Sequence, residues 1–316
     1  MIAVIGAGAF GTALSVALAR VGPVTLWARK DADIMMSSRQ SSRLPDVTLP
    51  DAVRPTADLA DCKDATAVLL AIPTQQLSGF LAKHGSELPD VPLVGCCKGI
   101  DVETGHGPTL VMSMHVPRAK VAILTGPSFA ADIARFLPTA LTLACADEAI
   151  GHALQLRLST PTLRLYRSQD VTGAELGGAL KNVIAIGCGA VIGAGLGTSA
   201  RAALMTRGFA EIQRLAMGLG AEANTLQGLS GFGDLALTCT SEMSRNFRFG
   251  ASLGAGQAFD TTQTVEGGAT AKAVARLAEK NGLDLPVCTT IAKLASGQMD
   301  VQGAMDVLLA RPLKAE

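Results

Sequence analysis

The chain has 316 residues with 27 basic and 27 acidic side chains, so its formal net charge is zero. This balance provides no basic surface for nucleic acids or anionic membranes, and an aromatic content of 3% argues against base stacking. A chain of this length is expected to form two domains, each able to bury a core.

The N-terminal segment carries the first functional motif. Residues 2–5 are an apolar run typical of a buried parallel strand, and GAGAFG follows at 6–11, before a helical pattern. A GxGxxG segment in this context predicts a dinucleotide-binding turn. Gly6 permits the tight turn, Gly8 lets a pyrophosphate approach the backbone, and Gly11 lets helix and strand pack closely. The phosphates would meet free N–H groups at the helix N-terminus.

The next predicted strand, at 24–27, bears on the choice of cofactor. An acidic residue after such a strand binds the ribose 2′-hydroxyl of NAD, whereas Arg29 and Lys30 suit a 2′-phosphate. We therefore favour NADP(H). Asp31 and Asp33 lie close enough to leave NAD(H) open, and the alternative is a solvated charged loop.

Three later apolar runs predict strands that end at one edge of the same sheet, where parallel strands line a ligand crevice. They deliver Pro73-Thr74, Lys98-Gly99 and the segment TGPSFA at 125–130 to that edge. Lys98 is thus a candidate site residue. The strand runs are 67–72, 92–97 and 121–124, with two further strands expected at 141–144 and 163–166 and polar loops and turns over 33–64.

The alternation of strands and helices stops near residue 168. We predict an α/β fold with a doubly wound, Rossmann-type dinucleotide-binding domain over 1–168 and an all-α substrate domain over 169–316. The expected helices of the second domain are 175–194, 201–219, 222–238, 269–281 and 301–310.

Lys181 is the unusual residue of the first of these helices, which is otherwise almost uncharged. A buried ammonium group is costly unless it is paired, so the lysine is either functional or extends its amine to the surface. The stretch 183–200 also has the apolar character of a membrane span, but its glycines and polar end favour a buried helix. We expect no membrane insertion.

Two polar clusters follow in the second half. Asp234 and Thr238 are four residues apart and therefore share a helix face. Ser244-Arg245-Asn246 lies in a polar loop or at a helix start, and its guanidinium offers a planar donor fork for a phosphate. The alternative for this tripeptide is a capped surface turn.

Cysteine and histidine usage narrows the class of protein further. The seven cysteines are odd in number and show no CxxC spacing, which indicates a reduced cytoplasmic protein. The four histidines show no HxxxH or HExxH spacing, so no zinc site is predicted. The chain begins on a strand pattern without a basic leader, and no signal peptide is expected.

Taken in order, the motifs resemble those of the bacterial NAD(P)-dependent glycerol-3-phosphate dehydrogenases over nearly the whole chain. The motifs are GAGAFGTALS at 6–15, LWAR at 26–29, CCKGID at 96–101, TGPSFA at 125–130, ELGGALKNVIAIGCG at 175–189, GLSGFGDLALTCTSEMSRNFRFG at 228–250 and VEG at 265–267. Two departures are noted: Phe10 stands where many relatives carry Trp or Tyr, and Lys30 lies where the family varies.

The resemblance implies reversible hydride transfer between NAD(P)H and dihydroxyacetone phosphate, which yields sn-glycerol 3-phosphate for phospholipid synthesis. It also implies a cytoplasmic homodimer. Lys181 matches the catalytic acid/base. The residues that match substrate-binding positions are Lys98, Gly126, Ser128, Lys181, Asp234, Ser244, Arg245 and Asn246. The residues that match cofactor-binding positions are Ala9, Phe10, Arg29, Lys98, Ala130, Arg245 and Glu266. The predicted cofactor site also includes the glycine motif (Gly6, Gly8 and Gly11) and Lys30.

Two other functions are considered. A β-hydroxyacid or 6-phosphogluconate type dehydrogenase would share the two-domain plan, but Asp234 with Ser244-Arg245-Asn246 fits the glycerol-phosphate family. A cofactor-sensing regulator without catalysis should lack some of the polar site residues, whereas all of the matched ones are present.

Overall fold

The computed structural model describes residues 1–260 and 264–310, in two compact units. The first unit comprises Met1–Lys98 and His106–Glu175, and the second comprises Gly99–Gly105 and Leu176–Glu316. The sequence predicts a division between residues 168 and 169. In the structure the boundary between the units lies inside helix α7 (Val171–Gly193), after Glu175. The short segment Gly99–Gly105, from the first half of the chain, also belongs to the second unit.

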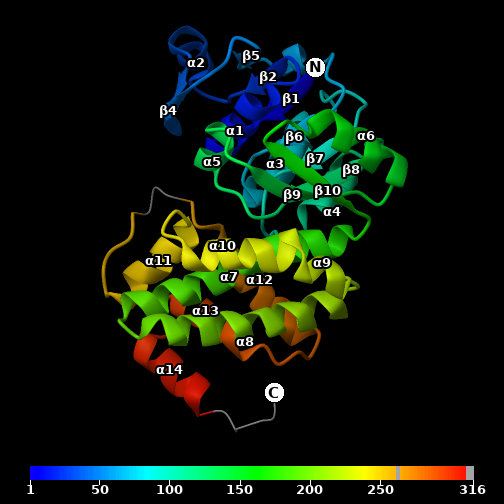
Figure 1. The fold of residues 1–316 in the computed structure, drawn as a ribbon. Coiled ribbons are helices and arrows are strands. Elements are labelled where there is room, and N and C mark those ends of the chain that lie inside the picture. Colours follow the sequence, from blue (N-terminus) through cyan, green and yellow to red (C-terminus); the bar gives the residue numbers. More distant parts are fainter. Residues whose placement is uncertain (261–263, 311–316) are drawn as a thin grey trace. The chain divides into compact units, whose positions relative to one another are not determined.

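The first unit is built on a sheet that has eight strands in the described chain (Figure 1). Their order is β10-β9-β8-β7-β6-β1-β2-β5. In this order, each pair of neighbours from β8 through β7, β6, β1 and β2 to β5 is parallel. Strand β9 is antiparallel to β8, and β10 is parallel to β9. The bounds are β1 Ile2–Ile5, β2 Val24–Trp27, β5 Val53–Thr56, β6 Val68–Leu70, β7 Leu93–Gly95, β8 Val121–Thr125, β9 Thr139–Ala144 and β10 Leu163–Ser168.

Helices cover both faces of this sheet, and strand β1 shows why. Val4 belongs to a core with Leu14 of α1, whereas Ile5 belongs to a second core with Leu77 of α3. Successive side chains of a strand point to opposite faces, so a strand buried on both faces reads as a continuous apolar run. The helices of this unit are α1 Ala9–Leu18, α2 Ala32–Ser38, η1 Leu59–Cys62 (a 3₁₀ turn), α3 Thr74–His84, α4 Pro108–His115, α5 Ala130–Ala134 and α6 Glu148–Leu158.

Two expectations for the first half are corrected. The region 33–64, expected as loops and turns, contains α2, β5 and a small antiparallel pair, β3 (Gln40–Ser41) with β4 (Leu44–Thr48). Strands β4 and β5 are short and contain polar residues and a proline each (Pro45 and Pro55), so they lack the apolar run that identifies buried strands. The sheet is also mixed rather than wholly parallel, because β9 reverses direction.

The order of strands places a topological switch between β1 and β6. Strand β1 pairs with β2 on one side and with β6 on the other. In open α/β sheets ligands bind outside the carboxyl ends of the strands at such a point. The glycine turn after β1 lies here beside the end of β6: a Cβ on Gly6 would stand 2.6 Å from the carbonyl oxygen of Ala71.

The second unit is helical and is organised around α7 (Figure 1). Every residue from Gly177 to Ala190 is buried. Helix α11 packs backbone against backbone on α7, since a Cβ on Gly189 would lie 2.0 Å from the carbonyl oxygen of Phe247. The helices are α8 Gly197–Gly218, α9 Ala223–Gln227, η2 Leu229–Gly233 (a π-helical turn), α10 Asp234–Thr240, α11 Arg245–Gly254, α12 Glu266–Lys280, α13 Pro286–Ala295 and α14 Val301–Leu309.

Helix α7 is long and apolar enough, by length and composition, to cross a membrane, with a mean hydropathy of 1.6 in its most apolar window. Within the structure, 78% of that window is buried against other parts of the protein. The close approach of α11 accounts for glycine at Gly189 and Gly193, because any side chain there would strike the α11 backbone. These contacts confirm the prediction of a buried helix.

Between residues 222 and 295 the structure differs from the helical predictions in two respects and agrees with them in one. The segment 222–238 is not one helix but α9, the turn η2 and α10. The helical conformation is broken at Gly228, whose backbone is extended between α9 and η2. Ser244 lies at a helix start, which was one of the two expectations, and α11 follows it. Helix α13 was not predicted; Pro286 sits at its first position, where the missing N–H of proline is tolerated.

Candidate active site

The glycine turn of the first unit has the shape that a bound pyrophosphate requires. Gly6 adopts a φ of +110°, which L side chains rarely adopt, and a Cβ on Gly11 would lie 2.0 Å from the carbonyl oxygen of Gly6. Nothing lies within 4 Å of the place where a Cβ on Gly8 would stand. The turn is therefore closed at Gly6 and Gly11 and open at Gly8, which fits a dinucleotide cofactor at the N-terminus of α1.

Two predicted cofactor residues begin helices beside this turn. Ala9 is the first residue of α1, and Ala130 is the first residue of α5, which packs against α1. Phe10 is half-buried and packs against the core beneath the sheet. Arg29 and Lys30 follow the carboxyl end of β2, and both side chains are exposed. Their charges thus face solvent at the strand end where a 2′-phosphate would be read.

The structure brings together three predicted residues at the ends of β7 and β8. The ammonium group of half-buried Lys98 donates to the carbonyl oxygen of Gly126 at 2.8 Å. The hydroxyl of Ser128 donates to the same oxygen at 3.2 Å. Gly126 has a φ of +136°, and this conformation turns the chain after β8. Lys98, Gly126 and Ser128 therefore form one polar cluster.

In the second unit Lys181 is buried and paired. Its side chain is 8% exposed, and its Nζ lies 2.7 Å from Oδ1 of Asp234, a carboxylate with 0% exposure. Nζ also donates to Oγ1 of Thr238 at 2.6 Å. The surface-extension alternative is thereby excluded. Two oxygen acceptors compensate the loss of hydration that makes an isolated buried ammonium group so costly.

Local sequence explains why these groups meet. Gly177 and Lys181 are four residues apart and share a face of α7. A Cβ on Gly177 would stand 2.7 Å from the carbonyl oxygen of Ser230, so η2 rests directly on this face. Helix α10 begins at the next residue after η2, and Asp234 and Thr238 lie one turn apart on it. The predicted shared face is confirmed.

The tripeptide Ser244-Arg245-Asn246 forms the N-terminus of α11. Ser244 is the N-cap, and its hydroxyl accepts from the backbone N–H of Phe247 at 3.2 Å. The side chain of Arg245 is exposed and makes no hydrogen bond or ion pair with residues 1–260 or 264–310. Asn246 is buried, and its Oδ1 accepts from the backbone N–H of Gly267, the residue after Glu266. Glu266 is itself half-buried and begins α12.

Two carboxylates outside these clusters are shielded from solvent, Glu211 almost completely and Glu175 in part. Oε1 of Glu175 accepts from the backbone N–H of Thr109 at 2.6 Å, and burial raises the pKa of Glu175 to about 7. Glu211 accepts from the backbone N–H groups of Val287 and Cys288 at the start of α13, and burial raises its pKa. Both carboxylates act as caps on helix N-termini, where the helix dipole favours negative charge.

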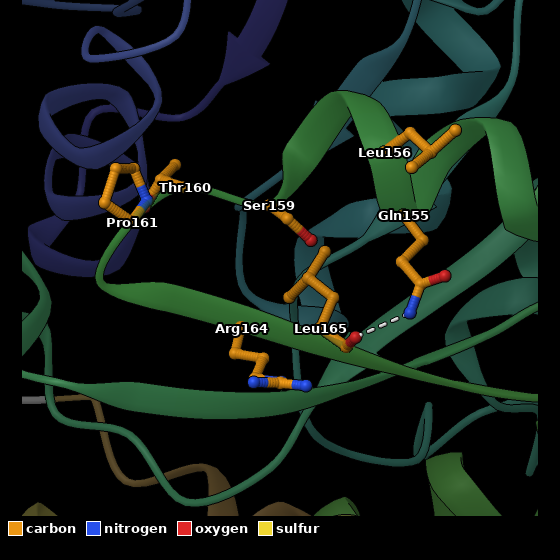
Figure 2. A pocket seen from close by; sticks show the side chains of 7 residues that line it. All are labelled: Gln155, Leu156, Ser159, Thr160, Pro161, Arg164 and Leu165. Atoms are coloured by element: carbon orange, nitrogen blue, oxygen red, sulfur yellow. Dashed lines mark hydrogen bonds between the residues drawn. The ribbon is translucent and has the colours of Figure 1, made fainter.

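A surface hollow of about 360 Å³ lies elsewhere in the first unit, between α6 and β10 (Figure 2). Figure 2 shows Gln155 bridging the two elements through its Nε2, which donates to the carbonyl oxygen of Leu165 at 2.8 Å. None of the predicted site residues lines this hollow. In the described ranges 1–260 and 264–310, no cluster of three His, Cys, Asp or Glu side chains could hold a metal ion.

Sequence reasoning assigned no direct role to Thr238, to the contact of Asn246 with Gly267, or to Glu175. A signal for Thr238 existed, since it shares a helix face with Asp234. Gly267 and Thr109 interact through their backbone N–H groups, which any residue except proline carries, so no sequence pattern identifies them.

Comparison with known proteins agrees with this arrangement. The family described as NAD-dependent glycerol-3-phosphate dehydrogenase matches through its N-terminal domain over residues 1–151 and through its C-terminal domain over residues 170–306. Glycerol-3-phosphate dehydrogenase [NAD(P)+] of Ruegeria sp. (strain TM1040) is 58% identical over 318 residues, covering 100% of this chain and 99% of the relative. The enzyme of the same name from Paracoccus denitrificans (strain Pd 1222) is 59% identical, with the same coverage.

A solved structure shows the same fold. The crystal structure of glycerol-3-phosphate dehydrogenase from Coxiella burnetii superimposes with a TM-score of 0.92 at 33% identity, covering 98% of each chain. Both domains of the family are therefore present in their usual order, with the glycine turn in the first and the paired lysine in the second. The chain belongs to the NAD-dependent glycerol-3-phosphate dehydrogenase family.

Proposed function

We propose that this protein catalyses the reversible reduction of dihydroxyacetone phosphate to sn-glycerol 3-phosphate with NAD(P)H. The observation that carries the proposal is the buried Lys181–Asp234–Thr238 cluster in a chain of this family. A ketone can be reduced only if its oxygen receives a proton as its carbon receives a hydride. The buried ammonium group is a proton source held in one position.

In this reaction Lys181 is the general acid. Asp234 and Thr238 accept two of its N–H bonds, which fixes the direction of the third. When bound, the reduced nicotinamide supplies the hydride. The ammonium form of this lysine, held by the carboxylate of Asp234, is the form that donates a proton in the direction of reduction. Acid–base catalysis of this type contributes roughly 10²–10⁴-fold to the rate.

The substrate phosphate is assigned to the N-terminus of α11 in the second unit. Arg245 offers an exposed guanidinium at the N-terminus of α11, where the helix dipole also favours an anion. Ser244 and Asn246 flank it. We assign Lys98, Gly126 and Ser128, which form one polar cluster, to the same substrate.

The cofactor is assigned to the glycine turn. Gly6, Gly8 and Gly11 shape the pyrophosphate site, with Ala9 and Phe10 at the start of α1. Arg29 and Lys30 are exposed beyond β2, which favours NADP(H) over NAD(H). Family resemblance further assigns Lys98, Ala130, Arg245 and Glu266 to the cofactor. The first domain is thus the dinucleotide-binding domain and the second the substrate domain.

The family resemblance also supports a role in phospholipid supply for a cytoplasmic homodimer. The mostly buried state of α7 supports a protein that does not insert into membranes. All seven cysteines are buried, as expected for a chain that folds without disulfides.

The proposal is tested by steady-state oxidation of NADPH and NADH by the purified protein. Dihydroxyacetone phosphate should be reduced, while dihydroxyacetone, which lacks the phosphate, should react far more slowly. Faster turnover of a 2-oxo or 3-oxo acid would indicate a β-hydroxyacid type dehydrogenase instead. Tight NADPH binding without turnover of any triose phosphate would indicate a regulator.

A further inference from the structure

The side chain of Asn246 connects the N-termini of two helices in the second unit. Its Oδ1 accepts from the backbone N–H of Gly267 at 2.9 Å, and the residue as a whole is 9% exposed. A backbone N–H can only donate, so the amide oxygen must face Gly267. The amide NH₂ group therefore points the other way, and it makes no hydrogen bond with residues 1–260 or 264–310.

Gly267 is held on its other sides as well. A Cβ there would stand 2.6 Å from the carbonyl oxygen of Asn182 and 2.8 Å from Oδ1 of Asn246. No side chain fits, so the start of α12 rests directly on α7 and on the start of α11. One turn later, the fully buried Thr270 donates from its hydroxyl to the carbonyl oxygen of Glu266 at 2.9 Å.

These contacts fix the backbone on which Glu266 is carried. The first N–H groups of a helix have no partner within the helix, and Asn246 satisfies one of them from a neighbouring helix. We propose that Asn246 is a positioning residue for the cofactor as well as a substrate ligand. Its oxygen sets Glu266 through Gly267, and its NH₂ group faces the substrate phosphate beside Arg245.

This inference rests on the proposed function, because it takes Glu266 as a cofactor contact and Arg245 as a phosphate contact. It adds a physical link between them. The same amide group serves both ligands, so loss of its oxygen and loss of its NH₂ group should have different effects. Substitutions that remove one function and keep the other can therefore separate the two roles.

The test compares Asn246→Ala with Asn246→Asp by fluorescence titration of NADPH without substrate and by KM for dihydroxyacetone phosphate. Asn246→Ala should weaken NADPH binding about tenfold, the loss of one buried hydrogen bond. Asn246→Asp keeps an acceptor for Gly267, so NADPH affinity should stay within about threefold of wild type. Its new negative charge would face the phosphate and should raise KM at least about tenfold.

A control is available at the other end of α12, where the side-chain amide of Asn281 donates to the carbonyl oxygen of Leu277. Asn281→Ala should change neither constant. The inference is overturned if Asn246→Ala raises KM while leaving NADPH affinity unchanged, or if Asn246→Asp loses NADPH affinity as fully as Asn246→Ala.

A double-mutant cycle covers the case in which Asn246→Ala does not fold. Asn246→Ser then replaces it, because its shorter side chain does not reach Gly267, and its effect on NADPH affinity is compared with and without Glu266→Gln. A loss of affinity that shrinks in the Glu266→Gln background supports the link, and equal fold losses in the two backgrounds overturn it. If wild type binds NADPH but does not reduce dihydroxyacetone phosphate, the proposed function fails, while the titrations still decide the role of Asn246.

Discussion

The ammonium group of Lys181 lies 2.7 Å from the carboxylate of Asp234, and both side chains are buried in the second unit. The desolvation cost of each buried charge is compensated mainly by its attraction to the other charge. Removing one partner leaves an uncompensated buried charge, whereas removing both can be nearly neutral.

The first prediction concerns stability. Asp234→Leu should lower the free energy of unfolding by about 3–5 kcal/mol, because it leaves the lysine without its counter-charge. The double variant Lys181→Met/Asp234→Leu should recover more than half of that loss. Urea unfolding followed by circular dichroism measures both. Equal stability of the single and double variants would show that the charge pair is not the source of the loss.

The second prediction concerns catalysis. Lys181→Ala should lower kcat by roughly 10²–10⁴-fold, because it removes the proposed proton donor, while NADPH affinity stays close to that of wild type. Lys272→Ala, which removes an exposed lysine of α12, is the matched control and should leave kcat unchanged. A Lys181→Ala variant with near-wild-type kcat would end the assignment of Lys181 as the acid.

The third prediction concerns cofactor choice. Arg29→Ala should weaken NADPH binding much more than NADH binding, because we assign its guanidinium to the 2′-phosphate that only NADPH carries. Paired titrations with the two cofactors provide the comparison, with the exposed Lys63→Ala as a control for loss of a positive charge. Equal losses for NADPH and NADH would show that Arg29 does not read the phosphate.

The fourth prediction separates the folding and binding roles of the glycine turn. Gly11→Ala should destabilise the protein, because its Cβ would lie 2.0 Å from the carbonyl oxygen of Gly6. Gly8→Ala should leave the melting temperature almost unchanged, since that Cβ meets nothing within 4 Å, but should weaken NADPH binding. Thermal unfolding and cofactor titration together check the pair. A Gly8→Ala variant with unchanged NADPH affinity would contradict the assigned pyrophosphate site.

The fifth prediction concerns pH. Burial raises the pKa of Glu175 in the folded state to about 7, above its ordinary value of 4.5. Between these values the folded state binds more protons than the unfolded state, so this group's contribution to stability falls as pH rises from about 4.5 to about 7. The loss reaches at most roughly 3 kcal/mol, since one pKa unit corresponds to about 1.4 kcal/mol.

Glu175→Gln keeps an oxygen acceptor for Thr109 but does not titrate. The stability of this variant relative to wild type should therefore increase with pH across that window, as measured by urea unfolding at several pH values. Glu103→Gln, which removes an exposed carboxylate, should show no such trend. Parallel pH profiles for Glu175→Gln and wild type would contradict the assigned cause.

The sequence predicts much of this architecture, because its strongest signals are local. The strand–glycine–helix order at the N-terminus and the apolar runs of β1, β2, β6, β7 and β8 are confirmed. The shared face of Asp234 and Thr238 follows from helical spacing alone. Their meeting with Lys181 depends on how η2 packs against Gly177, more than fifty residues away in the chain, which no local pattern reveals.

Direction and continuity of elements were harder to predict. A buried apolar run such as Leu141–Ala144 looks the same whether its strand is parallel or antiparallel to its neighbour, so the reversal at β9 has no local signature. The edge strand β5 contains a proline and an exposed arginine, Arg54, and it lacks the apolar pattern of the central strands. Helix α9 and helix α10 share one apolar periodicity, which concealed the π-helical turn between them.

Because Gly99–Gly105 belongs to the second unit, it limits where sequences of this family can be recombined. Ile100 is 2% exposed within the core of that unit, and Arg276 donates to the carbonyl oxygen of Val102 at 2.9 Å. Neither unit is therefore a single continuous stretch of sequence. A chimera joined to a relative near residue 168 would combine one parent's Ile100 with the other parent's helical core. Recombination between distant relatives should succeed only when this seven-residue segment travels with the C-terminal half.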